Sequence, residues 1–407
     1  MVPDVVVAPE FALAVCGSVL GGIALGTLSG LVPGLHANNV ALLLAAGAAA
    51  APGPPTLVAC AMLAAGVVHT FLDVVPALAL GVPDPAMAAS ALPGHRLVVE
   101  GRGEEALRLS ALGSVLAVAL AVPLAVPITS AMTALYPHVV ANLSFVLGGI
   151  ALAMVLTEPT WTGRLGATIA VGASGGLGLL TLDAPVSGPL GGSTLMPLFA
   201  GLFGVPVLLD AMDGAGVPEQ DDATLALSKR SVAGLGGVGT LSGAAVGYLP
   251  GVSSAVAATL ALTAVPGRYG ARGFVVATSG VNTANTVFAL FALFALGTPR
   301  TGVLVAVDDT VGTPSLPLSV LAVLGAALAG FALVGTLGPS YLRLVGSVDP
   351  TRLSVAVLGL LCVFAWLFAG VLGVGLLVAA GVVGLLPPRL GVKRAHLMGV
   401  LVGPLAL

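Results

Sequence analysis

The chain has 407 residues, of which 57% are hydrophobic and only 8% are charged, and its formal net charge at pH 7 is −3. A soluble domain carries about 25% charged residues because its surface must be solvated, so this composition excludes a soluble protein. The slightly acidic balance and the lack of a basic run argue against nucleic-acid binding.

Apolar runs that can cross a hydrocarbon core recur along the whole chain. The segment before the first run has no Lys or Arg, which argues against a cleaved signal peptide. We predict an all-α polytopic membrane protein with about 10–13 transmembrane or re-entrant helices. The predicted spans are Phe11–Val32, Leu35–Ala50, Thr56–Gly81, Leu109–Leu135, Val139–Thr157, Leu165–Leu182, Thr194–Leu209, Ser231–Leu249, Val252–Val265, Phe274–Leu296, Pro317–Leu337, Leu353–Ala369 and Val371–Leu386. Leu35–Ala50 and Val252–Val265 are short enough to be re-entrant.

The positions of the basic residues predict the topology. If the N-terminus lies outside, 13 of the 14 Lys and Arg fall inside and Arg300 alone lies outside, as the positive-inside rule expects. We therefore predict a plasma-membrane protein with an outside N-terminus and a cytoplasmic C-terminus. Pro83–Arg108 is predicted as a cytoplasmic loop with an interfacial helix.

A second polar segment, Glu219–Arg230, divides the chain into comparable halves. We predict halves at residues 1–218 and 231–407, joined by a cytoplasmic linker at 219–230. The first half contains a broken-helix element at 26–83 and a loop at 84–108, and the second contains a broken-helix element at 239–299.

The two broken-helix elements resemble each other in sequence. GTLSG occurs at Gly26 and at Gly239, and each copy is followed by a Pro-Gly pair. The first element ends in ALALGVP and the second in LFALGTP; 50 residues separate Pro33 from Pro83, and 49 separate Pro250 from Pro299. With the predicted topology, the repeats are inverted. Inverted repeats with interrupted helices are typical of secondary transporters, which bind their substrate near the breaks.

Scarce polar residues gather at these breaks. Four of the five asparagines of the chain lie in the two elements. A broken helix leaves unpaired N–H groups and a positive dipole end, which suit a carboxylate or phosphate, and freed carbonyls can bind Na⁺. The predicted substrate- and ion-binding residues are Pro33, Gly34, His36, Asn38, Asn39, Thr70, Asp73, Pro250, Gly251, Ser253, Ser254, Asn282, Asn285 and Thr286.

Structural readings of the same residues stay open. In the structural alternative, the Asn and Ser side chains cap the broken helices and contact no substrate. His36 could bind an anion, carry a proton or bond a freed carbonyl. His69 and Asp73 share a helix face and form either a proton or cation relay or a satisfied buried pair.

Other candidate sites are less well supported. The three cysteines lie far apart in apolar runs and indicate no disulfide frame or metal site. The Gly-rich runs at 172–178 and 234–239 lack the Lys of a phosphate-binding loop and fit helix packing better. Ser174 has no evident catalytic partner, so we do not expect an enzyme, and we expect no cofactor.

The motifs resemble those of the TctA-type large membrane subunit of tripartite tricarboxylate transporters. The resemblance rests on GTLSGLVPGL at Gly26–Leu35, the segment Gly81–Ser114, GYLPGVSSAVAA, and SGVNTANTVFALFALFALGTP, where Asn282 and Asn285 match an N-x-x-N element. The chain departs from the usual bacterial subunit in its shorter length and in the run HANN after Pro33-Gly34. It looks like an archaeal-type branch, for which action without the soluble binding protein is an alternative.

The family resemblance implies a secondary transporter of di- or tricarboxylates coupled to a Na⁺ or H⁺ gradient. It also implies a small membrane subunit and a soluble binding protein as partners. Apart from the resemblance, we expect contacts with membrane lipid and with a small anionic solute, and we keep a homodimer as an option. An elevator-like movement would fit this architecture. The alternative function is a flippase for a lipid-linked anion such as polyprenyl phosphate, because helix breaks that bind carboxylate also suit phosphate.

Overall fold

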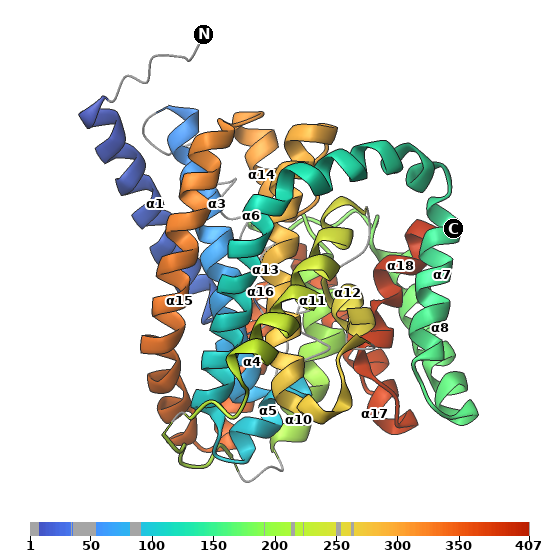
Figure 1. Cartoon of the computed structure of the whole chain (residues 1–407). Helices are drawn as coiled ribbons and strands as arrows, with labels where there is room; N and C mark the ends of the chain where they lie inside the picture. Colours follow the sequence, from blue (N-terminus) through green and yellow to red (C-terminus); the bar gives the residue numbers. More distant parts are fainter. Residues whose placement is uncertain are drawn as a thin grey trace.

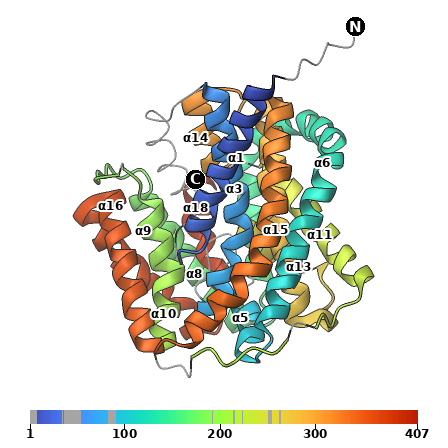
Figure 2. The same cartoon turned by 90° about the vertical axis from the view of Figure 1, so that its left-hand side faces the viewer.

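The computed structural model (Figures 1 and 2) describes residues 8–33, 35, 54–81, 91–190, 192–212, 216–222, 224–249, 254–261 and 264–406. Within these residues the chain is built from helices, and seven of them are long and apolar enough to cross a membrane. The prediction of an all-α polytopic membrane protein is therefore confirmed.

Most predicted spans coincide with helices, and the span Leu35–Ala50 lies outside the described residues except for Leu35. The long helices are α1 (Pro9–Gly30), α3 (Pro55–Leu72) with α4 (Val74–Leu80), α6 (Gly103–Ala141), α7 (Leu143–Leu156), α8 (Trp161–Thr181), α9 (Leu195–Phe199) continued by η2 (Ala200–Gly204) and α10 (Val205–Met212), α11 (Lys229–Tyr248), α13 (Gly270–Leu296), α15 (Leu316–Gly346) and α16 (Pro350–Gly384). The shorter helices are α5 (Ala91–Val99), α12 (Ser254–Ala261), η4 (Gly267–Tyr269), α14 (Gly302–Val311), α17 (Leu386–Leu390), η5 (Arg394–Met398) and α18 (Gly399–Ala406).

Helix α6 is longer than predicted at both ends. It begins at Gly103, inside the segment predicted as loop, because Glu104 and Glu105 suit the positive end of a helix. At its other end it runs through Pro137 to Ala141, since a membrane helix tolerates proline when its neighbours supply partners.

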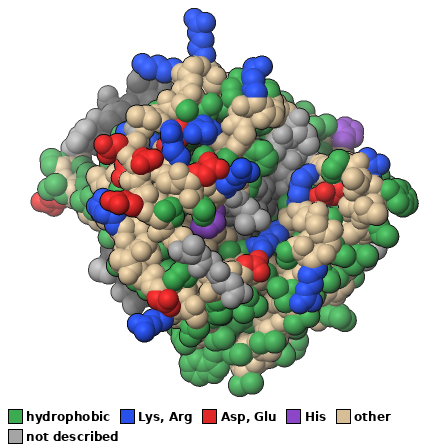
Figure 3. Space-filling model, turned by 90° about the horizontal axis from the view of Figure 1, so that it is seen from below, with side chains coloured by type: hydrophobic (Ala, Val, Ile, Leu, Met, Phe, Trp, Pro, Cys, Tyr) green, Lys and Arg blue, Asp and Glu red, His purple; other side chains and the backbone are tan. Residues whose placement is uncertain are grey.

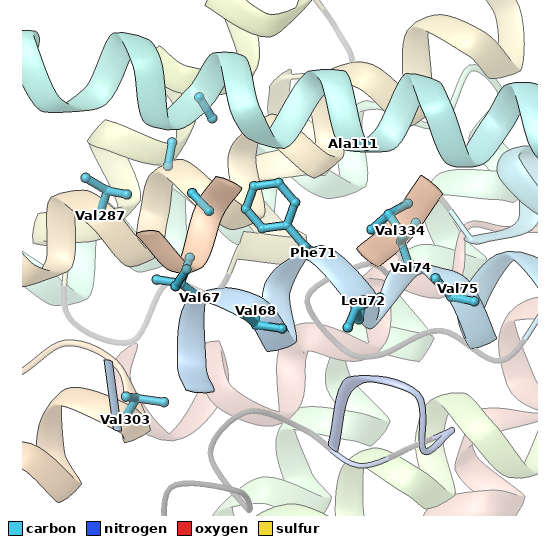
Figure 4. Packing of buried hydrophobic residues seen from close by; sticks show 14 of the residues in the cluster. Val67, Val68, Phe71, Leu72, Val74, Val75, Ala111, Val287, Val303 and Val334 are labelled. Atoms are coloured by element: carbon cyan, nitrogen blue, oxygen red, sulfur yellow. The ribbon is translucent and has the colours of Figure 1, made fainter. Parts of the chain in front are cut away.

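Helix α3 lies at the centre of the bundle. In its most apolar window 89% of the residues are buried, against 11% in α1. The ring of Phe71 lies against Gly330 of α15, and Val67, Val68 and Leu72 pack with residues of the neighbouring helices (Figure 4). Helices α9, α10 and α16 form a layer at one edge of the molecule (Figure 2), and α7, α8 and α18 pack together at another edge (Figure 1).

One helix pair in each predicted half packs through a row of three glycines. Gly22, Gly26 and Gly30 of α1 lie against the backbone of α3 in what we call the first glycine seam. Gly239, Gly243 and Gly247 of α11 lie against α13 in the second glycine seam. A Cβ on any of these six glycines would overlap the facing helix, so only glycine permits so close an approach.

The two seams match residue for residue. Gly30 faces the carbonyl of His69 and the N–H of Asp73, and Gly247 faces the carbonyl of Asn285 and the N–H of Ala289. Equivalent positions in α1 and α11 are therefore 217 residues apart, the same separation as between Pro33 and Pro250. Equivalent positions in α3 and α13 are 216 residues apart. The GTLSG strings, which are 213 residues apart, are therefore displaced by one helical turn from the packing register.

The matched pairs run in opposite directions. In Figure 1, α1 and α3 descend, whereas α11 and α13 ascend. Helices α4 and α13 end in the same way, because the residues that follow them, Gly81 and Gly297, both adopt the left-handed conformation, with φ of 67° and 63°. The helix ends that carry Lys and Arg, except for Arg300, lie at the lower end, where charged side chains gather (Figure 3). We call this end the lower face.

The linker between the halves is fastened to the lower face through Glu105. This side chain is 1% exposed and accepts hydrogen bonds from the guanidinium groups of Arg102 and Arg272 at 2.7–3.0 Å. It also accepts the backbone N–H of Ala226 at 2.8 Å. One buried carboxylate thus joins α6, α13 and the linker.

A second carboxylate holds the C-terminal segment. Glu158, which follows α7, is 5% exposed and lies 2.8 Å from Nε2 of His396, a completely buried residue of η5. Within the described part of the chain, Nδ1 of His396 has no hydrogen-bond partner, so a proton there would leave a buried N–H unsatisfied. Burial accordingly lowers the pKa of His396 below its ordinary value of 6.5, although the contact with Glu158 opposes this effect.

The first glycine seam can be tested with a single methyl group. Gly26→Ala should lower the free energy of unfolding in detergent by about 1–3 kcal/mol, because the helices must separate to admit the Cβ. Gly17→Ala is the matched control on the same helix, since nothing lies within 4 Å of its Cβ position. Equal stabilities of the two variants would contradict the seam.

The state of His396 predicts a pH dependence. Because the unfolded chain binds a proton at this residue more readily than the folded chain, its contribution to stability is present above pH 6.5 and is lost as the pH falls below that value. As the pH falls through this range, the free energy of unfolding of the wild type should decrease by up to about 1.4 kcal/mol per pH unit relative to that of His396→Gln, as measured by thermal unfolding. The glutamine can still donate to Glu158 but does not titrate. Parallel pH profiles for the two proteins would refute this assignment.

Candidate functional site

The two repeats meet at a buried hydrogen bond between Asp73 and Asn282. Nδ2 of Asn282 donates to Oδ2 of Asp73 at 2.9 Å, and both side chains are at most 5% exposed. Asp73 stands at the break between α3 and α4, and Asn282 lies near the middle of α13. Ser254, the first residue of α12, donates to Oδ1 of Asn282 at 3.4 Å. Three predicted site residues from distant parts of the chain are thus in contact.

Next to this contact lies His69, one turn before Asp73. Its Nδ1 is 3.0 Å from the hydroxyl of Ser29 on α1, and both residues are buried. The first glycine seam causes this contact, because Gly30 brings the α1 backbone against the carbonyl of His69. The ionisable pair on α3 therefore has hydrogen-bonding neighbours on two other helices.

Polar side chains continue along α13. The hydroxyl of Ser279 is 2.8 Å from that of Ser110 on α6, and Ser114 donates to the Ser279 carbonyl at 3.4 Å. The buried hydroxyl of Thr283 has no hydrogen-bond partner among the described residues. Polar groups in an apolar bundle are costly without partners, so this face of α13 is well suited to contact a polar ligand.

Not every predicted residue joins the contact. Thr70 donates to the carbonyl of Val67 and Thr286 to that of Asn282, so both hydroxyls bond their own helix. Pro33 is buried just after α1, and Asn285 is partly exposed on α13. The remaining predicted residues lie outside the described part of the chain: Gly34, His36, Asn38, Asn39, Pro250, Gly251 and Ser253.

Ser29, Ser110 and Ser279 belong to this polar region but were not among the predicted site residues. Ser29 could have been found, because it lies in the repeated GTLSG string four residues before Pro33. Ser279 opens the string SGVNTANT and Ser110 lies in the segment Gly81–Ser114, but in a helix sequence a hydroxyl that bonds another helix looks the same as one that bonds its own backbone. Nothing in the sequence distinguishes the two cases.

Comparison with known proteins decides the family. The model of the tripartite tricarboxylate transporter TctA family matches residues 17–399. The chain belongs to this family. It is also similar to the uncharacterized protein MJ1079 of Methanocaldococcus jannaschii, with 26% identity over 298 residues that cover 70% of each chain. No solved structure matches.

Family membership makes the chain a membrane component of a tricarboxylate transport system that works with other subunits. The match includes both glycine seams and the contact between Asp73 and Asn282. The polar contact thus lies within a transport protein, at a place where opposed repeats meet.

The Asp73–Asn282 contact predicts coupled stabilities. In a double-mutant cycle of Asp73→Ala and Asn282→Ala, the interaction free energy of unfolding should be about 1–2 kcal/mol, because each single change removes one partner of the same buried hydrogen bond. Asn142→Ala removes an exposed amide and should change stability little. Additive effects of the two site changes would contradict a direct interaction.

Proposed function

We propose that this chain is the permease of a secondary transporter for a di- or tricarboxylate, driven by a cation gradient. The observation that carries the proposal is the buried hydrogen bond between Asp73 and Asn282, which joins the two oppositely directed helix pairs. A solute bound there would touch both repeats, so a movement of one repeat against the other would change the side from which it is accessible.

The cation is assigned to the Asp73 side of the contact. An intramembrane carboxylate is costly and marks ion pathways in transporters. Pro76 has no N–H to donate to the Leu72 carbonyl, so at the α3–α4 break this carbonyl would lack its usual helical partner and could serve as a cation ligand. Carboxylate and carbonyl oxygens suit Na⁺, and the carboxylate alone would suffice for H⁺.

The anion is assigned to the α13 side. Asn282 and Ser254 have neutral side chains. Ser254 is also the N-terminal residue of α12. The hydroxyl of Thr283 supplies a hydrogen-bond donor. By the packing register Asn285 corresponds to His69, so the second repeat presents an amide where the first presents a titratable ring. Neutral donors and a helix N-terminus suit a carboxylate.

The proposed surroundings follow from the family and from the charge distribution. A small membrane subunit and a soluble solute-binding protein would act with this chain, and a homodimer is compatible with the proposal. The basic lower face would be cytoplasmic in a plasma membrane, with the N-terminus outside.

Uptake into proteoliposomes tests the proposal. The wild type should accumulate labelled citrate or a C4-dicarboxylate when a Na⁺ or H⁺ gradient is imposed. Asp73→Asn should abolish the response to the gradient, and Asn285→Ala should raise the half-saturating solute concentration roughly tenfold, the loss expected for one hydrogen bond to a charged group. The control Asn142→Ala should transport like the wild type. Gradient-dependent uptake that survives Asp73→Asn would reject the assignment of the cation.

One observation favours the lipid-linked alternative. A groove of about 940 Å³ lies between α1 and α15, and its described lining is apolar from Phe11 to Ile23 on α1. It would accept an acyl or prenyl chain. It stops six residues before Ser29, or about 9 Å along the helix, so a lipid tail there could place its headgroup near the polar contact. Transfer of polyprenyl phosphate between leaflets, with no transport of free carboxylates, would favour this function.

A further inference from the structure

Arg394 is a buried cation in η5, far in sequence from the polar contact. Its side chain is 7% exposed, and Nη2 donates to Oδ2 of Asp210 on α10 at 2.9 Å. Within the described residues, Nη1 is buried and has no hydrogen-bond partner. Because an unpartnered buried donor costs roughly 1–3 kcal/mol, and more when it is charged, an additional acceptor at Nη1 would be stabilising.

Among the described residues, the carboxylate of Glu158 bonds other groups and makes no hydrogen bond to Nη1 of Arg394. Glu158 faces His396 at 2.8 Å and the backbone N–H of Lys393 at 3.2 Å, and the Lys393 ammonium is 4.0 Å away. Asp210 is 60% exposed, so the hydrogen bond that it accepts from Nη2 of Arg394 lies on the solvent side of the guanidinium. Arg394 thus has one arm paired with an exposed carboxylate and one arm turned into the protein.

The segment that carries Arg394 borders the second broken-helix element. Ala395, Leu397 and Met398 of η5 pack in the same apolar cluster as Val256 of α12 and Val281 of α13. Val281 directly precedes Asn282. The residues that follow Arg394 therefore belong to the same apolar cluster as the helices that carry the polar contact.

We propose that Nη1 of Arg394 binds an anionic oxygen group, a carboxylate or a phosphate, at the lower face of the protein. A guanidinium is a planar fork that stays charged when buried and bonds such groups in fixed geometry. Asp210 occupies one arm and competes with the ligand for the charge. The ligand is the free solute or a lipid headgroup, which share this chemistry. The inference rests on the proposed function only in identifying the free ligand with the transported anion.

Ligand binding to the full chain tests the site without requiring transport. In nanodiscs of phosphatidylcholine, the affinities for citrate and for inorganic phosphate would be measured by thermal shift. Arg394→Gln should weaken binding tenfold or more, since it removes a charged hydrogen bond. Asp210→Asn should tighten binding several-fold, because the competing carboxylate is neutralised. Arg389→Gln, an exposed arginine near η5, should bind like the wild type.

Repeating the measurement in Asn282→Ala protein separates this site from the proposed solute site, because the dependence on Arg394 should persist there. Absence of gradient-driven citrate uptake by the wild type, together with Arg394-dependent anion binding, would reject the proposed function and leave this site intact. If the effect of Arg394→Gln appears only when anionic phosphatidylglycerol replaces phosphatidylcholine, the ligand is a lipid headgroup.

Two results would overturn the proposal. In one, Arg394→Gln binds citrate, phosphate and phosphatidylglycerol like the wild type, which would leave water as the partner of Nη1. In the other, Asp210→Asn weakens anion binding, which would make the arginine–aspartate pair purely structural. If Arg394→Gln does not fold, Arg394→Lys keeps the charge but loses the fork, and unchanged anion affinity in that variant would also reject the site.

Discussion

Close backbone contact at the two glycine seams determines how the rest of the bundle is arranged. In a bilayer the hydrophobic effect does not drive helices together, so association depends on packing and on hydrogen bonds between helices. The seams hold α1 on α3 and α11 on α13, and this places Ser29 beside His69. The two pairs then meet where Asp73 bonds Asn282. The contact between Ser29 and His69 therefore depends on the absence of side chains in the first glycine seam.

The sequence predicted the class of fold and the positions of most spans. These features depend on local composition: long apolar runs, Pro-Gly pairs and the clustering of basic residues. Local composition did not predict the packing register, that is, which residues of the two helix pairs correspond. The GTLSG strings invite an alignment that is one turn away from the observed match, because glycine recurs every four residues in both helices. Only the contacts across each seam distinguish the two registers.

The structure brings together three of the predicted residues, Asp73, Ser254 and Asn282, but the sequence did not predict which of them pair. Asp73 and Asn282 are 209 residues apart, so no spacing rule connects them. The same holds for the lower face. Charge bias predicted that Arg389, Lys393 and Arg394 lie on one side of the membrane, but their burial differs sharply. The short helix η5 turns Arg394 and His396 inward, and no periodicity in the sequence indicates that turn.

The glycine seams also have an entropic consequence. Most helix interfaces immobilise side chains that were free to change rotamer, which opposes association. Glycine has no rotamers to lose, so the backbone contacts at Gly22, Gly26 and Gly30 form without this opposing term. The cost of glycine instead falls on the helix itself, where it is about 1 kcal/mol per residue relative to alanine. The glycines thus lower the intrinsic stability of each helix but allow the paired helices to pack more closely.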